Sequence, residues 1–377
     1  MRKSPLLDLL PLFLYLLLTG ALLAQALTNT GGQTGYPVDD AYIHMAIARH
    51  FAQHGRWSVD LSPFTSASSS PLWTFLLAVV FRIIGVRDWA ALLLSLLAGA
   101  AALLTAQRLL AASGRRLVRA ALAVLVLIFT PLPVLGLTGM EHALHALLSA
   151  AVLWPAAEFL AAREESIRSR PGLLILCALL PVTRYEGLFL LLWILLALLW
   201  QKRLRAALTL GAAGASLMTI YGLISLANGW AFFPNSVLVK STPALTSTAG
   251  LAQFLTQGIV NLLDTPALFG LILAVLLAFA PAEGLGLLTP AQRWRVGLFC
   301  GMFLLHVQLA KVGWFFRYEA YLIFTGSLLL MELLGVLVKW LQSRPQGRFT
   351  PLTAAVLMLT LLLLLPLAYR GGNALSA

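Results

Sequence analysis

The stretch LLDLLPLFLYLLLTGALLAQAL, residues 6–27, decides the fold. It carries a single charged side chain, Asp8, and an α-helix of about 20 mostly apolar residues is long enough to cross a bilayer. Similar stretches recur along the whole chain, in which 60% of the 377 residues are hydrophobic and 11% are charged. Soluble domains are nearer to about 45–50% apolar and about 25% charged, which excludes a water-soluble globule and a disordered chain. The sequence predicts an all-α polytopic membrane protein.

Eleven apolar runs are expected to span the membrane. They cover residues 6–27, 89–112, 120–137, 142–162, 171–182, 187–200, 206–227, 266–282, 296–310, 320–341 and 351–368. A further run, residues 71–85, is shorter and contains Arg82, so we expect an interfacial or re-entrant helix there. The chain, residues 1–377, is therefore predicted to form one transmembrane domain, and no soluble domain is expected after the last span.

The basic residues predict the orientation. The net charge is +12, and most of the 26 Lys and Arg residues fall on one side of the predicted spans. The positive-inside rule then places the N-terminus in the cytoplasm, and it accounts for the basic charge without nucleic acid as a partner. The alternative of a signal peptide cleaved after Ala26 is disfavoured, because residues 6–27 are long enough to span.

Two predicted outer segments are too long to be simple connections, residues 28–88 and residues 228–265. Many of the acidic side chains also fall on the outer side, although carboxylates carry little information about topology. Their gathering there needs another reason, and we expect function at the outer face.

The first outer segment contains YPVDDAYIHMAIARHFAQHGRW, residues 36–57. Apolar residues recur from Ile43 at helical spacing, which indicates an amphipathic helix at the interface. Asp39 and Asp40 either cap this helix and favour its dipole, or one of them acts as general base on an acceptor hydroxyl. His44 shares a helix face with Asp40, where it either hydrogen-bonds that carboxylate or joins it as a weak metal-ligand pair.

Further charged residues map to the same side. TGMEHALHALL, residues 138–148, places Glu141 where a span begins, and a favourable helix dipole is the alternative explanation for it. TRYEG, residues 183–187, sets Arg184 and Glu186 between two apolar runs, where they pair with each other or Arg184 contacts a phosphate.

Two more segments add cations and polar groups at the outer side. KVGWFFRYEAY, residues 311–321, and PNSVLVKS, residues 234–241, contribute Lys311, Arg317, Tyr318, Glu319, Asn235, Ser236 and Lys240. Carboxylates beside cations suit a reaction in which a hydroxyl attacks and an anionic group leaves. Transporters also carry intramembrane charges, but they place these near the midplane on broken helices.

These segments resemble a family. YPVDDAYIHMAIAR, followed by SSSPLWTFLLA, is similar to the opening of bacterial polytopic GT-C glycosyltransferases, especially arabinofuranosyltransferase-like and mannosyltransferase-like members. TGMEHALHALL resembles their Gly-Leu-Glu-Thr-Ala-Leu segment, with Met140 and His142 as departures, and TRYEG resembles their Thr-Arg-Pro-Glu-Gly, with Tyr185 replacing Pro. PNSVLVK resembles their Pro-Asn-Thr-x-x-x-Lys, and Arg317 followed by tyrosine also fits. The matches run in order over residues 36–320.

The resemblance implies a GT-C fold and an inverting transfer of a sugar from a polyprenyl-phosphate donor to a hydroxyl of a membrane-associated glycan or lipid, at the extracytoplasmic face of a bacterial inner or plasma membrane. Carried across, the catalytic residues would be Asp39 or Asp40 as base and Glu141 orienting the acceptor or a divalent cation. The donor phosphate would meet Arg184, Lys240 and Arg317. Further substrate contacts are expected from Tyr42, His44, Glu186, Asn235 and Tyr318, and if a metal takes part its ligands would be Asp40 and His44.

Two alternatives from other classes stay open. A secondary transporter or lipid flippase would show similarity between two halves and charges near the midplane, and neither feature is visible in the sequence. A non-catalytic GT-C-like subunit would keep the fold without the chemistry, and sequence alone does not distinguish it from an enzyme.

Overall fold

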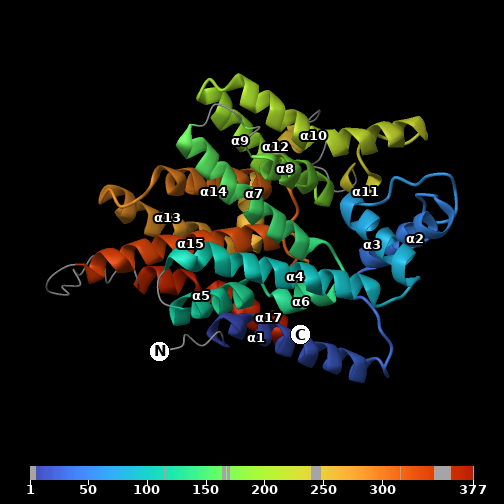
Figure 1. Ribbon diagram of the computed structural model, residues 1–377, viewed down its shortest axis with the longest axis horizontal. Helices are drawn as coiled ribbons and strands as arrows, with labels where there is room; N and C mark the ends of the chain where they lie inside the picture. The colour runs from blue at the N-terminus through green and yellow to red at the C-terminus, as the bar shows by residue number, and fades with distance from the viewer. Residues whose placement is uncertain are drawn as a thin grey trace.

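The computed structural model describes residues 6–113, 116–163, 167, 170–238, 248–314, 316–343 and 358–376. Within these ranges the regular structure is helical, with one isolated β-bridge between Trp57 and Phe64. Many of the long helices run roughly along one direction, and two shorter helices, α2 and α3, lie together at one end of the bundle (Figure 1). We call this the α2–α3 end.

Seven described helices are long and apolar enough to cross a membrane. They are α1 (Leu6–Asn29), α4 (Ala90–Leu109), α7 (His142–Ala162), α10 (Leu204–Ala227), α13 (Pro266–Gly284), α15 (Ala320–Gln342) and the stretch Met358–Leu375, which includes most of α17 (Leu365–Ser376). The prediction of an all-α protein suited to a multi-pass place in a bilayer is confirmed. The count of eleven spans and the GT-C type of the fold stay predictions.

The other expected spans fall on shorter or more polar helices. These are α5 (Arg116–Phe129), α6 (Leu132–Leu137), α8 (Pro171–Thr183), α9 (Gly187–Trp200) and α14 (Pro290–Leu309), with a short 3-10 turn, η1 (Leu110–Ser113), before α5. The run 120–137 divides into α5 and α6 at Pro131, which cannot donate a helical backbone hydrogen bond. Within the run 351–368, residues 351–357 lie outside the described ranges.

The helix expected in the first outer segment is α2 (Asp39–His54), and the short run after it is α3 (Pro71–Ile84). The N-cap of α2 is Val38, so the expectation that Asp39 or Asp40 caps this helix is wrong. Both carboxylates instead lie in its first turn, where their negative charge interacts favourably with the positive end of the helix dipole.

A separate apolar cluster joins α2 to α3. Met45 and Ala48 of α2 are buried with Trp73 and Leu77 of α3, and Ser70 caps α3 by accepting a hydrogen bond from the Trp73 backbone at 3.4 Å. Since burial of such side chains contributes about 1.5–3 kcal/mol each, the two helices form a stable unit on the end of the bundle.

The second long segment covers the same end. It contains α11 (Asn235–Leu238) and the amphipathic α12 (Thr248–Asp264). The Asn261 side chain donates to the carbonyls of Val307 and Ala310 at 2.7 and 3.1 Å, which fastens α12 to the last turn of α14. These two hydrogen bonds hold the first residue of the α14–α15 connection, Ala310, against α12.

The centre of the bundle is formed by α7 and α15. In each of these helices, 72% of the most apolar 18-residue stretch is buried inside the protein. The corresponding share for α1, at the edge of the bundle, is 17%. The first residues of both central helices point to the α2–α3 end, because Glu141 precedes α7 and Arg317 precedes α15, and both contact α2. The most deeply buried helices thus support the polar side chains described next.

Candidate functional site

Four segments bring charged side chains together at the α2–α3 end. They are the start of α2, the α6–α7 connection, the α8–α9 connection and the α14–α15 connection, and the side chains are Asp40, His44, Glu141, Arg184, Glu186 and Arg317. We call these six side chains the polar cluster. They come from segments far apart in the sequence, so the cluster exists only in the folded protein.

The backbone at two of these connections depends on glycine. Gly139 has φ of +65°, a conformation that glycine adopts without strain, and it turns the chain just before Glu141. At Gly187 a Cβ would lie 2.7 Å from the Leu180 side chain, so glycine lets α9 start close against α8. Arg184 lies at the corner between these helices, and the whole residue is only 6% exposed.

Arg184 is the most heavily bonded member of the polar cluster. Its Nη1 donates to Oε1 of Glu141 at 2.7 Å, and its Nη2 and Nε donate to the two carboxylate oxygens of Glu186 at 2.6 and 3.2 Å. Glu141 is fully buried. The expected Arg184–Glu186 pair is therefore present, but it is bidentate and extends to a second carboxylate across 43 residues of sequence.

Charge and burial shift the pKa values of this pair. Burial by itself raises the pKa of Glu186, but the neighbouring Arg184 guanidinium outweighs it and lowers that pKa to about 2. For Arg184 burial opposes the charged form, while the carboxylates of Glu186 and Glu141 stabilise it, and its pKa lies above the ordinary value. Both groups are charged at neutral pH.

A second ion pair joins α2 to the α14–α15 connection. Nη2 of Arg317 donates to Oδ2 of Asp40 at 2.9 Å and to the Tyr318 hydroxyl at 3.2 Å. Arg317 is 3% exposed, and its Nε and Nη1 have no hydrogen-bond partner among the described residues. Buried donors of this kind are costly unless a ligand or water satisfies them, so the guanidinium has capacity for an added anion.

Tyr318 links the two arginines. Its ring centroid lies 5.5 Å from Cζ of Arg184 and 4.9 Å from Cζ of Arg317, both within the range of cation–π attraction. The ring is 7% exposed and its position is therefore well defined. The Tyr318 ring therefore lies close to both guanidinium groups.

His44 is fixed by hydroxyl groups. Its Nδ1 lies 2.8 Å from Oγ1 of Thr74 and 3.2 Å from Oγ of Ser68, and its Nε2 lies 3.8 Å from Oε2 of Glu141. Among the residues that the structure describes, no group of three His, Cys, Asp or Glu side chains is placed to hold a metal ion. Arg317 donates to Oδ2 of Asp40, and the Asp40–His44 metal pair stays a prediction.

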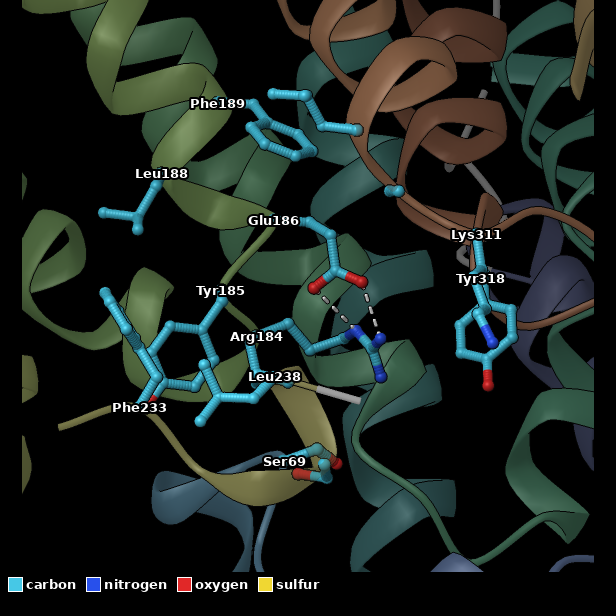
Figure 2. Close-up of a pocket in the computed structure, with 14 residues that line it drawn as sticks. Ser69, Arg184, Tyr185, Glu186, Leu188, Phe189, Phe233, Leu238, Lys311 and Tyr318 are labelled. Carbon is cyan, nitrogen blue, oxygen red and sulfur yellow. Dashed lines mark hydrogen bonds and ion pairs between the residues drawn. The ribbon is translucent and has the colours of Figure 1, made fainter. Parts of the chain in front are cut away.

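A cavity of about 340 Å³ opens beside the polar cluster. Figure 2 shows Arg184 and Glu186 facing each other at its middle, with Lys311 and Tyr318 on one side and Tyr185 and Phe233 on the other. Most of the remaining wall is apolar, including Leu188, Phe189 and Leu309. A charged spot inside a largely apolar cavity suits a molecule with an anionic headgroup and a hydrocarbon part.

The other predicted residues lie around the edge of the cluster or elsewhere. Asp39 is exposed, and its carboxylate accepts only from the Asp40 backbone, at 3.0 Å, among the bonds that the structure defines. The hydroxyl of Tyr42 accepts from the Tyr36 backbone at 2.8 Å, with its ring 49% exposed. Asn235 begins α11 and donates from its backbone to Ser66 at 2.9 Å. Lys240 lies outside the described residues.

Three features were not assigned from the sequence. Lys311 lines the cavity, although only its charge and predicted side were noted. Arg370 donates to Glu319 at 2.7 Å and to the Phe316 carbonyl at 2.8 Å, which holds the α14–α15 connection in place. The hydroxyls of Ser68 and Thr74 that contact His44 could not be identified from the sequence, in which only an abundance of serine before α3 is visible. A lone arginine after the last apolar run was the one available hint for Arg370.

No family model matches the chain, and neither does any curated protein or solved structure. The fold defines an all-α protein with helices suited to a membrane, and the polar cluster and its cavity define a buried, charged site at one end of it. The chemistry of the site rests on its own geometry.

Proposed function

We propose that the protein is an inverting glycosyltransferase, which moves a sugar from a polyprenyl-phosphate donor to a hydroxyl of a membrane-associated glycan or lipid. The observation that carries the proposal is the Asp40–Arg317 pair, which a hydrogen bond from Arg317 to Tyr318 connects to the wall of a largely apolar cavity. Arg184 and Lys311 line the same cavity. A carboxylate beside cations, at the end of apolar helices, matches an attacking hydroxyl and a departing lipid phosphate.

In the proposed reaction Asp40 is the base. Its carboxylate takes the proton from the acceptor hydroxyl as that oxygen forms a bond to the anomeric carbon of the donor sugar. The bond from this carbon to the phosphate oxygen breaks, and its electron pair leaves with polyprenyl phosphate. Arg317 orients the base through its hydrogen bond to Oδ2. A well-placed general base contributes about 10²–10⁴-fold in rate.

The donor phosphate would lie in the cavity. The buried Nη1 and Nε of Arg317 and the ammonium of Lys311 are the donors proposed to meet it. All three nitrogens of Arg184 already donate to carboxylates. Its proposed role therefore changes from direct phosphate contact to that of a fixed positive charge beside Tyr318. Electrostatic groups of this kind contribute about 3–4 kcal/mol when aimed at the developing charge.

The apolar wall would take the first units of the polyprenyl chain. Leu188, Phe189 and Leu309 lie at the start of α9 and at the end of α14, next to parts of the bundle that would face lipid. By the positive-inside rule this end of the bundle lies outside the cytoplasm, where nucleotide sugars are scarce and a lipid-carried donor is needed.

Release of polyprenyl phosphate from a panel of polyprenyl-phosphate sugars, measured in nanodiscs, tests the proposal. We expect release from at least one donor by the wild-type protein and loss of at least about a hundredfold in Asp40→Asn. Absence of release from every donor by a folded wild-type protein would refute the enzyme proposal.

One observation favours a second candidate, a proton-coupled transporter or flippase. His145 and His306 lie inside the helix bundle around Tyr321, whose hydroxyl is 3.0 Å from Nδ1 of His306 and whose ring centroid is 4.3 Å from that of His145. Ionisable side chains at such positions often line proton or substrate pathways. Proton uptake coupled to lipid movement in liposomes, abolished by His306→Gln, would favour this candidate over the transferase.

A further inference from the structure

A second cavity lies at the α2–α3 end, and no member of the polar cluster lines it. It has a volume of about 500 Å³ and is lined by the last turns of α1, residues 30–37, the start of α4, the second half of α6 and the end of α17. None of the residues that line it is charged. The first cavity contains Arg184, Glu186 and Lys311, so the two cavities differ sharply in electrostatic character.

The second cavity borders the same segments as the polar cluster. Three of its lining residues stand near cluster members in the sequence, namely Pro37 before Asp40, Thr138 before Glu141 and Phe316 before Arg317. A Cβ at Gly139 would overlap the ring of Tyr36, another lining residue, so the wall of the cavity packs directly on the turn that leads to Glu141. A molecule in this cavity would therefore lie against the segments that carry Asp40, Glu141 and Arg317, inside an uncharged wall.

The lining indicates what kind of molecule would fit. Gln25, Asn29 and Thr34 supply neutral amide and hydroxyl groups, which exchange hydrogen bonds with hydroxyls without requiring a charge. Trp89 and Phe316 supply aromatic surface, which packs against the less polar faces of a sugar ring or a hydrocarbon chain. The absence of Lys and Arg from this lining does not favour a phosphate.

The apolar part of the lining points to a lipid. Leucines of α1, including Leu23 and Leu27, continue the cavity wall along a helix that carries exposed apolar side chains. Val134 and Leu137 of α6 add to the apolar lining. A hydrocarbon tail bound there would run alongside α1, the least buried of the long helices.

We propose that the second cavity binds an uncharged lipid whose headgroup carries sugar or polyol hydroxyls, and that this lipid is the acceptor of the transfer. The acceptor role rests on the proposed glycosyltransferase function, whereas binding of the lipid does not. The transfer step is the one described above, with a hydroxyl of this headgroup losing its proton to Asp40.

Binding is measured first, with the full-length protein in phosphatidylcholine nanodiscs. The probes are glucosyl diacylglycerol, anionic phosphatidylglycerol and soluble methyl glucoside. The variants are Trp89→Ala and Gln25→Ala in the cavity, with Trp200→Ala, a 79% exposed residue at the other end of the bundle, as matched control. We expect the glycolipid to bind with a Kd raised about tenfold by Trp89→Ala and about threefold by Gln25→Ala, and unchanged in the control.

The alternative results each overturn the inference. A Kd that neither cavity variant changes would show that the lipid binds elsewhere. Tighter binding of phosphatidylglycerol would contradict an uncharged ligand, and equal affinity for methyl glucoside would contradict a lipid.

Turnover then separates the two proposals. We expect Trp89→Ala to raise the KM for the glycolipid about tenfold while leaving the KM for the polyprenyl-phosphate donor unchanged. Release of polyprenyl phosphate that does not depend on the second cavity would keep the enzyme and overturn its acceptor site. Glycolipid binding lost in Trp89→Ala, without release from any donor, would keep the lipid site and refute the glycosyltransferase.

Discussion

Arg317 donates from Nη2 to Oδ2 of Asp40 at 2.9 Å, and 277 residues of sequence separate them. The arginine side chain is buried, and the carboxylate is 20% exposed. Breaking a buried pair by removing one partner typically costs about 3–5 kcal/mol, which makes this contact a structural tie between the first outer segment and the start of α15. The same contact fixes the orientation of the Asp40 carboxylate.

The first prediction separates the two adjacent aspartates. Asp40→Asn removes the proposed base but keeps the size of the side chain and an oxygen that accepts from Arg317, so we expect transfer to fall at least about a hundredfold with the melting temperature lowered by only a few degrees. Asp39→Asn is the matched control, because Asp39 is exposed and outside the cluster, and it should retain transfer within about threefold. Equal losses in both variants would contradict the assignment of Asp40.

The second prediction concerns Lys311. Its ammonium lines the cavity, so Lys311→Ala should raise the KM for the polyprenyl-phosphate donor about tenfold, as expected for loss of one exposed charge-assisted hydrogen bond. The effect should shrink as salt concentration rises, because salt screens the interaction. Lys339→Ala, near the far end of α15, controls for a general change in charge. An unchanged donor KM would remove Lys311 from the phosphate site.

The third prediction tests how Arg184 holds two carboxylates. Arg184→Met leaves Glu141 and Glu186 without their partner, and we expect a loss of about 3–5 kcal/mol in stability, read as a lower melting temperature in nanodiscs. The triple variant that adds Glu141→Gln and Glu186→Gln removes the uncompensated charges and should regain much of that stability. Additive losses in the triple variant would show that the three side chains do not act as one network.

The sequence predicted the positions of most helices because hydropathy alone determines them. The seven long apolar helices overlap the expected spans, and α2 and α3 lie where the helical spacing and the short apolar run indicated. The break at Pro131 was not foreseen, because proline also occurs inside helices of this chain, as at Pro155. Whether a proline ends a helix, as at Pro131, or lies within a continuous helix, as at Pro155, depends on tertiary packing.

The partners inside the polar cluster could not be predicted. Arg184 and Glu186 are two residues apart and their pair was one of two stated possibilities, but the contact of Arg184 with Glu141 depends on how α7 packs beside α8. Asp39 and Asp40 are equivalent in sequence, and their different exposure and the contact of Asp40 with the distant Arg317 appear only in the folded protein. The neighbours of His44, Ser68 and Thr74, reach it only after α2 folds on α3.

The fourth prediction follows from the lowered pKa of the Glu186 carboxyl group in the Arg184–Glu186 pair. The pKa of Glu186 is lowered from an ordinary 4.5 to about 2, so the charged carboxylate stabilises the fold. That contribution is fully present above about pH 4.5 and is lost as pH falls towards 2. We expect Glu186→Gln to melt at a lower temperature than wild type at pH 7 and to show a smaller decline between pH 5 and pH 3. A parallel decline in both proteins would contradict a stabilising role for this carboxylate.

The fifth prediction uses two glycines with almost the same backbone angle φ. Gly31 and Gly139 have φ of +63° and +65°, so alanine meets similar backbone strain at either position, about 1 kcal/mol. The surroundings differ, because a Cβ at Gly31 meets nothing within 4 Å, whereas one at Gly139 overlaps the ring of Tyr36. Gly139→Ala must displace that ring or the turn before Glu141, which adds an overpacking cost of about 1–3 kcal/mol.

These two alanine variants should therefore differ in both stability and activity. We expect Gly31→Ala to melt within a few degrees of wild type and to keep its transfer rate, while Gly139→Ala melts clearly lower and loses transfer more than tenfold. The reason is that a shift of about 1 Å in the Glu141 turn disturbs Arg184 and the cavity that it lines. Equal melting temperatures for the two variants would show that the contact between Tyr36 and the Glu141 turn does not constrain the site.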